Sequence, residues 1–146
     1  MAKSISLDFE GYWRHVNRGG TPASAGIYCV YRGTYNQSAE TVELKKLLYI
    51  GESENVRERL ASHEKESDWK RHLYTGEILI YSAALTGTDR YQAEAAMINK
   101  HKPVENTEYV NDFPFDRTFM TVSGRNALLE TSFIVDRQSS ASTWYR

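Results

Sequence analysis

Five polar side chains lie at spacings that would let them act together on a phosphodiester bond. Tyr28 and Tyr49 lie in two short apolar runs, and Arg59 precedes His63 by four residues. Glu94 interrupts a run of alanines further along the chain. Hydrolysis of a phosphodiester needs an oriented water, a group that takes its proton, positive charge at the phosphate and help for the leaving oxygen. The five side chains together can supply these functions.

Each of these residues taken alone also has a purely structural interpretation. The tyrosines are compatible with sheet packing in which the hydroxyl reaches water, and deprotonating a tyrosine at pH 7 costs about 4 kcal/mol. Arg59 and His63 are compatible with a solvated helix face. Glu94 is the most informative residue, because a carboxylate among alanines is either partly buried for a function or on the exposed side of a helix. The functional interpretation therefore depends on all five occurring together.

Other common chemistries lack their sequence motifs in this chain. It contains no GxxxxGK phosphate loop, no GxGxxG, no GxSxG and no HExxH sequence. A single cysteine cannot form an internal disulfide, and four scattered histidines do not have zinc-ligand spacing. One carboxylate such as Glu94 suits Mg²⁺, which keeps several waters and takes one or two carboxylates together with substrate phosphates.

The composition is that of a soluble domain of ordinary size. The 146 residues are 40% hydrophobic and 25% charged. No stretch approaches the roughly 18 consecutive apolar residues of a membrane helix, and the N-terminus lacks the apolar run of a signal peptide. We therefore expect a cytoplasmic protein with no membrane partner. The net charge of -1 implies that any binding of nucleic acid depends on a local basic patch.

The sequence also predicts the strands that must position these residues. Segments rich in β-branched and aromatic residues predict strands over residues 26–33, 47–51 and 77–85. The first two follow each other along the chain, which favours an antiparallel pair carrying Tyr28 and Tyr49. The polar residues 34–46 between them are predicted to form an inserted loop or a short helix.

Helical spacing predicts two helices after the second strand. The first covers residues 53–65, begins with Ser53 as its N-cap, and makes Arg59 and His63 neighbours on one face. A second, shorter helix is predicted to end at Gly76.

A third helix is predicted over residues 91–102, with Glu94 inside it and Pro103 after its end. Asp89 and Gln92 predict a capping box at its start. Because strands and helices do not alternate strictly, we predict an α+β fold with a small central sheet, mixed or antiparallel, of three strands flanked by helices.

The rest of the chain carries weaker patterns. They predict a loop over residues 112–116, a strand over 117–122, a helix over 124–136 and a polar tail from 137. We expect a single domain over residues 1–146. It would consist of an N-terminal extension (1–24), a core (25–108) and a C-terminal extension (109–146).

Four pieces of this sequence, in this order, resemble the GIY-YIG nuclease family. They are the triplet Gly26-Ile27-Tyr28, the triplet Tyr49-Ile50-Gly51, RERLASH and EAAMINKHKPVEN. One GIY triplet would mean little, but the ordered set spans more than half of the chain and is specific. The family includes the incision subunit of bacterial nucleotide excision repair, intron homing endonucleases and restriction enzymes. Twenty residues separate Tyr28 from Tyr49, more than in compact members, which again indicates an insertion.

The resemblance implies a role for each matching residue. Tyr28 would act on the attacking water, either directly or through a partner, and Tyr49 would support it by hydrogen bonding. His63 would assist either the water or the tyrosine pair. Arg59, rather than the nearby Arg57, would contact the scissile phosphate.

The remaining two matches imply a metal site and its support. Glu94 would bind a divalent metal, Mg²⁺ or Mn²⁺, and Asn106 would help to fix the site. The implied substrate is DNA, contacted through its phosphate backbone.

Two functions stay open on the sequence: a metal-dependent DNA endonuclease, which the full set of site residues favours, and a non-catalytic nucleic-acid-binding module of the same fold. Basic residues that could face phosphates are Arg14, Arg18, Arg57, Lys65, Lys70 and Arg71. The sequence shows no second DNA-binding module, which favours either low intrinsic specificity or a protein partner that supplies specificity. Trp69 is expected to be buried packing rather than a stacking platform. The oligomeric state, the choice between DNA and RNA, and a role in repair, restriction or mobile elements stay open.

Overall fold

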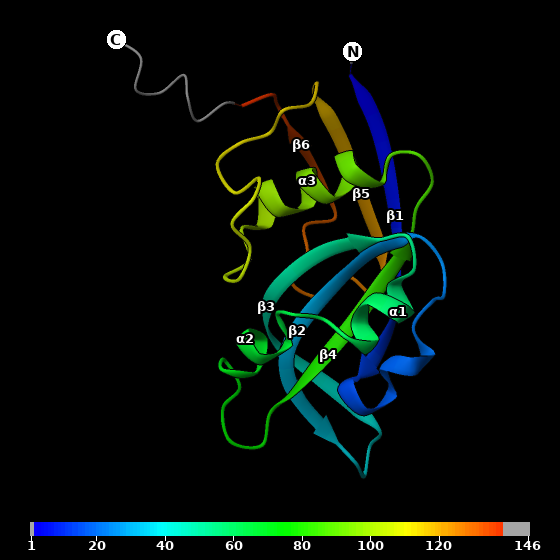
Figure 1. Cartoon of the computed structure of the whole chain (residues 1–146), viewed down its shortest axis with the longest axis vertical. Helices are drawn as coiled ribbons and strands as arrows, with labels where there is room; N and C mark the ends of the chain where they lie inside the picture. The colour runs from blue at the N-terminus through cyan, green and yellow to red at the C-terminus, as the bar shows by residue number, and fades with distance from the viewer. Residues whose placement is uncertain (1, 139–146) are drawn as a thin grey trace.

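A curled sheet of six strands organises residues 2–138, the part of the chain that the computed structural model describes (Figure 1). The strands are β1 (Lys3–Arg14), β2 (Gly26–Asn36), β3 (Thr41–Ser53), β4 (Ile78–Leu85), β5 (Thr118–Gly124) and β6 (Ser132–Val135). They lie in the order β3-β2-β4-β1-β5-β6, and every neighbouring pair is antiparallel except β1 with β5. Residues 139–146, which the sequence places in a polar tail, lie outside the described range.

The helices pack against both faces of this sheet. They are the 3-10 helix η1 (His15–Gly20), α1 (Val56–Ala61), α2 (Glu66–Lys70) and α3 (Arg90–His101). Buried residues of α1 and α2 pack with Tyr28 and Val30 of β2, whereas α3 packs with Ile27 and Cys29 on the other side of the same strand. The predicted α+β class is thus confirmed. The longest described helix, α3, has 12 residues, and no described helix is long and apolar enough to cross a bilayer.

The three predicted strands are neighbours in the observed sheet, in the order β3-β2-β4. β2 and β3 are antiparallel, as expected, with Tyr28 opposite Gly51 and Val30 opposite Tyr49. Residues paired across antiparallel strands point to the same side of a sheet. The register therefore places both tyrosines on the face that α1 and α2 cover.

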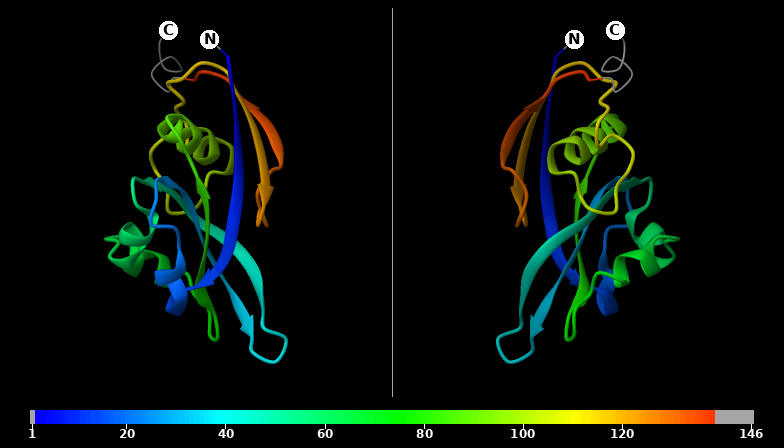
Figure 2. Two further views of the ribbon diagram at one scale, coloured as in Figure 1. Left: turned by 90° about the vertical axis from the view of Figure 1, so that its right-hand side faces the viewer. Right: turned by 90° about the vertical axis from the view of Figure 1, so that its left-hand side faces the viewer.

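The predicted sheet of three strands is wrong in size, because both ends of the chain add strands to it. β1 pairs with β4, and β5 and β6 follow on its other side, so that β1 runs along the length of the molecule (Figure 2). The predicted strand at residues 117–122 is confirmed as β5. The predicted helix over 124–136 is wrong, since Phe133 and Val135 are buried while Ser132 and Ile134 are exposed. That alternation has period two, and it suits a strand paired with β5.

The segment at residues 34–46 is neither an inserted loop nor a helix. β2 continues to Asn36 and β3 begins at Thr41, so these residues extend the hairpin and leave a turn of four residues at its tip. Val42 and Leu44 pack against the core from this extension. Glu43 between them is exposed, as are the neighbouring Thr41, Lys45 and Lys46, and these polar residues hide the strand in the sequence.

The start of α1 differs from the prediction. Asn55 is the N-cap, and its side chain accepts a hydrogen bond from the Glu58 N–H, whereas Ser53 binds the backbone of Asn55. The helix ends at Ala61, so His63 lies beyond it. The predicted shared helix face of Arg59 and His63 is therefore wrong.

The predicted third helix is confirmed as α3, but its capping box is wrong. Asp89 makes no capping hydrogen bond and pairs with Lys3 at 2.8 Å. Gln92 donates to the Thr118 hydroxyl at 2.8 Å. Both side chains are used to hold α3 against the strands contributed by the chain ends.

Candidate active site

Tyr28 and His63 form a hydrogen bond inside the protein. The Tyr28 hydroxyl lies 2.8 Å from Nε2 of His63, and Tyr28 is 1% exposed. β2 holds the tyrosine, and the connection between α1 and α2 holds the histidine. The imidazole also packs against Trp69, with ring centroids 4.4 Å apart, and against Tyr49 at 5.6 Å. The histidine is therefore oriented by rings on three sides.

The glycines of the two triplets make room for this arrangement. A Cβ at residue 51 would lie 2.4 Å from both Cζ and Oη of Tyr28, and a Cβ at residue 26 would lie 2.5 Å from the Ala84 carbonyl oxygen. Contacts this short are not tolerated in packed interiors. Gly51 thus lets the Tyr28 ring lie directly over β3, and Gly26 lets β2 approach β4.

The backbone determines which His63 nitrogen carries the proton. The N–H of Lys65 donates to Nδ1 of His63 at 3.1 Å. Burial, and then the charge of Arg59, lower the pKa of His63 to about 4, so the ring is neutral at pH 7. A neutral imidazole with an accepting Nδ1 carries its proton on Nε2. His63 therefore donates to the Tyr28 oxygen and leaves the phenolic proton free for another acceptor.

Tyr49 lies beside this pair and is partly exposed. Its ring centroid is 6.2 Å from that of Tyr28, and Lys65 Nζ lies 5.9 Å from the Tyr49 ring. Burial and the charge of Glu94 raise the pKa of Tyr49 to about 12. Burial, and then Tyr49, also raise the pKa of Tyr28, which Arg59 opposes. Both phenols are protonated at neutral pH in the free protein.

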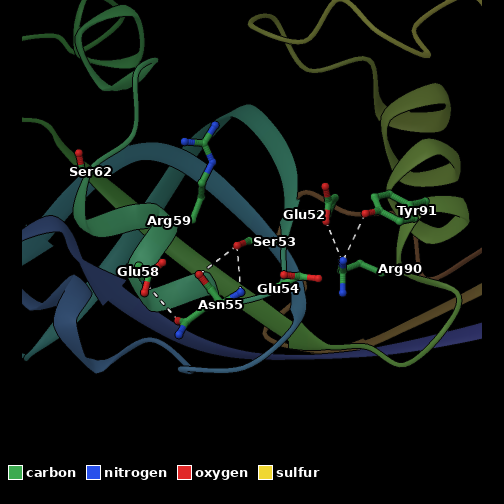
Figure 3. A pocket seen from close by; sticks show the side chains of 9 residues that line it. All are labelled: Glu52, Ser53, Glu54, Asn55, Glu58, Arg59, Ser62, Arg90 and Tyr91. Carbon is green, nitrogen blue, oxygen red and sulfur yellow. Dashed lines mark hydrogen bonds and ion pairs between the residues drawn. The ribbon is translucent and has the colours of Figure 1, made fainter.

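Arg59 lines an open cleft of about 610 Å³ (Figure 3). In Figure 3 it lies on α1, across the cleft from Arg90 and Tyr91 at the start of α3. Its guanidinium makes two contacts with the Glu64 carboxylate, at 2.7 and 2.8 Å. Arg57, by contrast, donates to the Thr21 carbonyl oxygen at 2.7 Å. The cleft is lined by Glu52, Ser53, Glu54, Asn55, Glu58, Arg59, Ser62, Arg90 and Tyr91.

Glu94 lies on α3, close enough to both tyrosines to affect their pKa values. Burial, then Glu52, then Glu108 raise the pKa of Glu94 to about 7. Glu52 in turn pairs with Arg90 at 2.6 Å. A half-buried carboxylate opposed by two others is electrostatically suited to a cation.

The donor set fits a magnesium-type site rather than a closed metal cage. Among residues 2–138 there is no group of three or more His, Cys, Asp or Glu side chains placed to hold a metal. Mg²⁺ accepts one or two protein carboxylates and completes its shell with water and substrate oxygens. Glu94, with Glu52 beside it, matches that requirement.

Asn106 contacts β3 rather than the cleft. Its amide accepts from the Ile50 N–H and donates to the Ile50 carbonyl, both at 2.9 Å. The structure thus brings Tyr28, Tyr49 and His63 into direct contact and places the Asn106 side chain against the strand that carries Tyr49. Arg59 and Glu94 act on this group through their charges, because Arg59 lowers and Glu94 raises the pKa values of the two tyrosines.

Three contacts of the site had no distinct sequence signal. Trp69 is buried, as expected, but it packs on His63. Glu64 pairs with Arg59, although spacing in the sequence suggested only a solvated face. Lys65 supplies the N–H that orients His63. All three lie in or just after the connection that follows α1, whose path depends on tertiary packing.

Comparison with known proteins identifies the family. The family model described as the GIY-YIG catalytic domain matches residues 26–109, more than half of the chain and a range that includes all six predicted site residues. No curated protein and no solved structure matches the chain significantly. Both triplets and the close approaches that their glycines permit lie inside the matched range. The chain belongs to the GIY-YIG family of catalytic domains, which are those of endonucleases.

Proposed function

We propose that this protein is a metal-dependent endonuclease that hydrolyses DNA phosphodiester bonds. The observation that carries the proposal is the buried 2.8 Å hydrogen bond from His63 Nε2 to the Tyr28 oxygen. A donor aimed at a phenolic oxygen stabilises negative charge on that oxygen. The positive charge of Arg59 acts in the same direction on the pKa of Tyr28.

Tyr28 is the residue that we place at the attacking water. The Tyr28 hydroxyl first releases its proton to solvent, and the resulting phenolate takes a proton from the attacking water. The hydroxide forms a bond to phosphorus while the bond to the leaving oxygen breaks, and that oxygen takes up a proton from solvent. His63 keeps its own proton on Nε2 and holds the tyrosine oxygen in place. Tyr49 packs beside Tyr28 and limits access of bulk water to it.

Arg59 is the residue that we place at the phosphate. Its planar guanidinium can bind two phosphate oxygens at once and stabilise the charge that develops on them. Glu94, with Glu52 beside it, would hold Mg²⁺ or Mn²⁺. Such an ion, when bound, supplies Lewis-acid stabilisation at the phosphate and the leaving oxygen. Asn106 keeps β3, and with it Tyr49, in position.

The test is cleavage of supercoiled, branched and single-stranded DNA with Mg²⁺ or Mn²⁺, together with a binding assay. Tyr28→Phe and Glu94→Gln should abolish DNA cleavage and leave DNA binding unchanged. Tyr31→Phe is the matched control, because Tyr31 lies on the opposite face of β2 and its hydroxyl bonds the Ala127 carbonyl. If the wild type binds every substrate and cuts none with either metal, the protein is a binding module and the proposal is wrong.

A further inference from the structure

The guanidinium of Arg59 is engaged by a carboxylate of its own chain. Nη1 lies 2.7 Å from Oε1 of Glu64, and Nη2 lies 2.8 Å from Oε2. Two parallel contacts between a guanidinium and two oxygens are also the geometry in which arginine binds phosphate. Glu64 therefore occupies the two donors that a phosphodiester would use.

The Glu64 carboxylate is exposed to solvent, whereas the neighbouring residues His63 and Lys65 are held by hydrogen bonds. The Glu64 side chain is 68% exposed, and that of Arg59 is 33% exposed. His63 is hydrogen-bonded to Tyr28, and the Lys65 N–H is bonded to His63. Rotation of the Glu64 side chain can therefore release Arg59 without moving the Tyr28–His63 pair.

Both partners stay charged over the physiological pH range. The hydrogen bond to Arg59 is the main cause that lowers the pKa of Glu64 to about 2, and the same bond raises the pKa of Arg59. Protonation therefore does not separate the pair near neutral pH. A competing anion that binds the Arg59 guanidinium can separate it.

We propose that Glu64 is an intramolecular competitor of the substrate, whose carboxylate a phosphodiester must displace from Arg59 before it can bind there. The proposal rests on the function above for the identity of that anion. Glu64 would thereby set the affinity for the DNA backbone. An exposed ion pair stabilises a protein only slightly, so the competition should weaken binding by about two- to five-fold.

Glu58 provides a matched control for the loss of one negative charge. It lies on α1 and lines the same cleft, and it makes no ion pair with any residue in the described range. Glu64→Gln and Glu58→Gln each remove one negative charge, one from the partner of Arg59 and the other from the cleft that Arg59 lines. Only the first frees Arg59.

The experiment measures the dissociation constant of a fluorescent DNA duplex without divalent metal, so that no cleavage occurs. The variants are Glu64→Gln and Glu58→Gln, each made with Arg59 present and with Arg59→Gln. Glu64→Gln should tighten binding about two- to five-fold, and clearly more than Glu58→Gln. The difference between the two should disappear in the Arg59→Gln background, as in any double-mutant cycle of an interacting pair.

Other results would overturn the inference. An equal gain in DNA affinity for both glutamate variants would indicate a general charge effect. A gain in affinity for Glu64→Gln that persists in the Arg59→Gln background would indicate the same. Weaker binding by Glu64→Gln would mean that Glu64 positions Arg59 for the phosphate.

Cleavage with Mg²⁺ is measured separately. If no variant cuts but the binding pattern is as expected, the endonuclease proposal fails and the role of Glu64 stands, whereas no binding by any variant overturns both.

Discussion

The side chain of Asn106 bonds both backbone groups of Ile50, accepting from its N–H and donating to its carbonyl at 2.9 Å each. β3 is an edge strand of the sheet, so an asparagine from the segment after α3 takes the place of a neighbouring strand there. Ile50 lies between Tyr49 and Gly51. This contact therefore ties the end of α3, the helix of Glu94, to the strand that supports both tyrosines.

Replacing Asn106 should loosen that connection. Asn106→Ala leaves two buried backbone groups of β3 without a partner, which should lower the free energy of unfolding by about 1 to 3 kcal/mol. Asn106→Asp can still accept from the Ile50 N–H, but its second carboxylate oxygen faces the Ile50 carbonyl oxygen, so it should lose more than alanine. Urea unfolding measures both variants. Equal losses for alanine and aspartate would contradict the two-bond interpretation.

Enlarging Gly51 should displace the Tyr28 ring. A Cβ at this position would lie 2.4 Å from the Tyr28 hydroxyl, so Gly51→Ala should break the bond to His63 and destabilise the fold by about 1 to 3 kcal/mol. DNA cleavage should fall with it. Gly87→Ala is the control, because a Cβ at residue 87 would meet nothing within 4 Å. Unfolding and cleavage assays on the two variants should differ clearly, and similar behaviour would rule out the steric argument.

His63 should stay neutral and carry its proton on Nε2. Its pKa of about 4 lies below the value of 6.5 for a free histidine, so the unfolded chain binds more protons between these values. The stability that neutral His63 contributes is therefore complete above pH 6.5 and is lost as the pH falls through about 4. His63→Gln should remove this part of the acid sensitivity, about 2 to 3 kcal/mol.

Two measurements check this assignment. Urea unfolding of the wild type and His63→Gln at pH 7 and pH 4 gives the difference in stability. Nitrogen-15 spectra of the imidazole show the tautomer directly, and Tyr28→Phe should keep the proton on Nε2 because the Lys65 N–H still binds Nδ1. A proton on Nδ1, or titration near pH 6.5, would show that the described orientation of His63 is wrong.

Divalent metal should stabilise the folded protein through Glu94. A ligand at ten times its dissociation constant adds about 1.4 kcal/mol to the free energy of unfolding. Thermal unfolding with and without Mg²⁺ or Mn²⁺ should show this increase for the wild type, and chelator should reverse it. Glu94→Gln should abolish the effect while Glu58→Gln keeps it. An unchanged metal response in Glu94→Gln would place the metal elsewhere.

Much of the central architecture could be predicted from the sequence because it depends on local patterns. The strands carrying Tyr28 and Tyr49 are rich in β-branched and aromatic residues, and their pairing follows from their closeness along the chain. α3 is a run of good helix formers that ends at His101, two residues before Pro103, and it was found where predicted.

The rest of the sheet depends on partners far away in the sequence. β1 becomes a strand between β4 and β5, both distant along the chain, and β6 pairs with β5 in a segment whose apolar residues also suit a helix. The hairpin extension at residues 34–46 is mostly polar on its outer side, so its pattern resembles that of a loop. Local propensity is a weak guide wherever pairing between distant segments decides the structure.

The sequence by itself determined the family, because two triplets and two later motifs occur in the order typical of that family. The same motifs identified the candidate site residues. The tertiary structure alone decided how these residues meet. Because α1 ends at Ala61, His63 points inward to Tyr28 while Arg59 stays in the cleft and binds Glu64. The end of a short helix and the burial of the chain after it are set by packing against Trp69 and the sheet, and no local pattern encodes that packing.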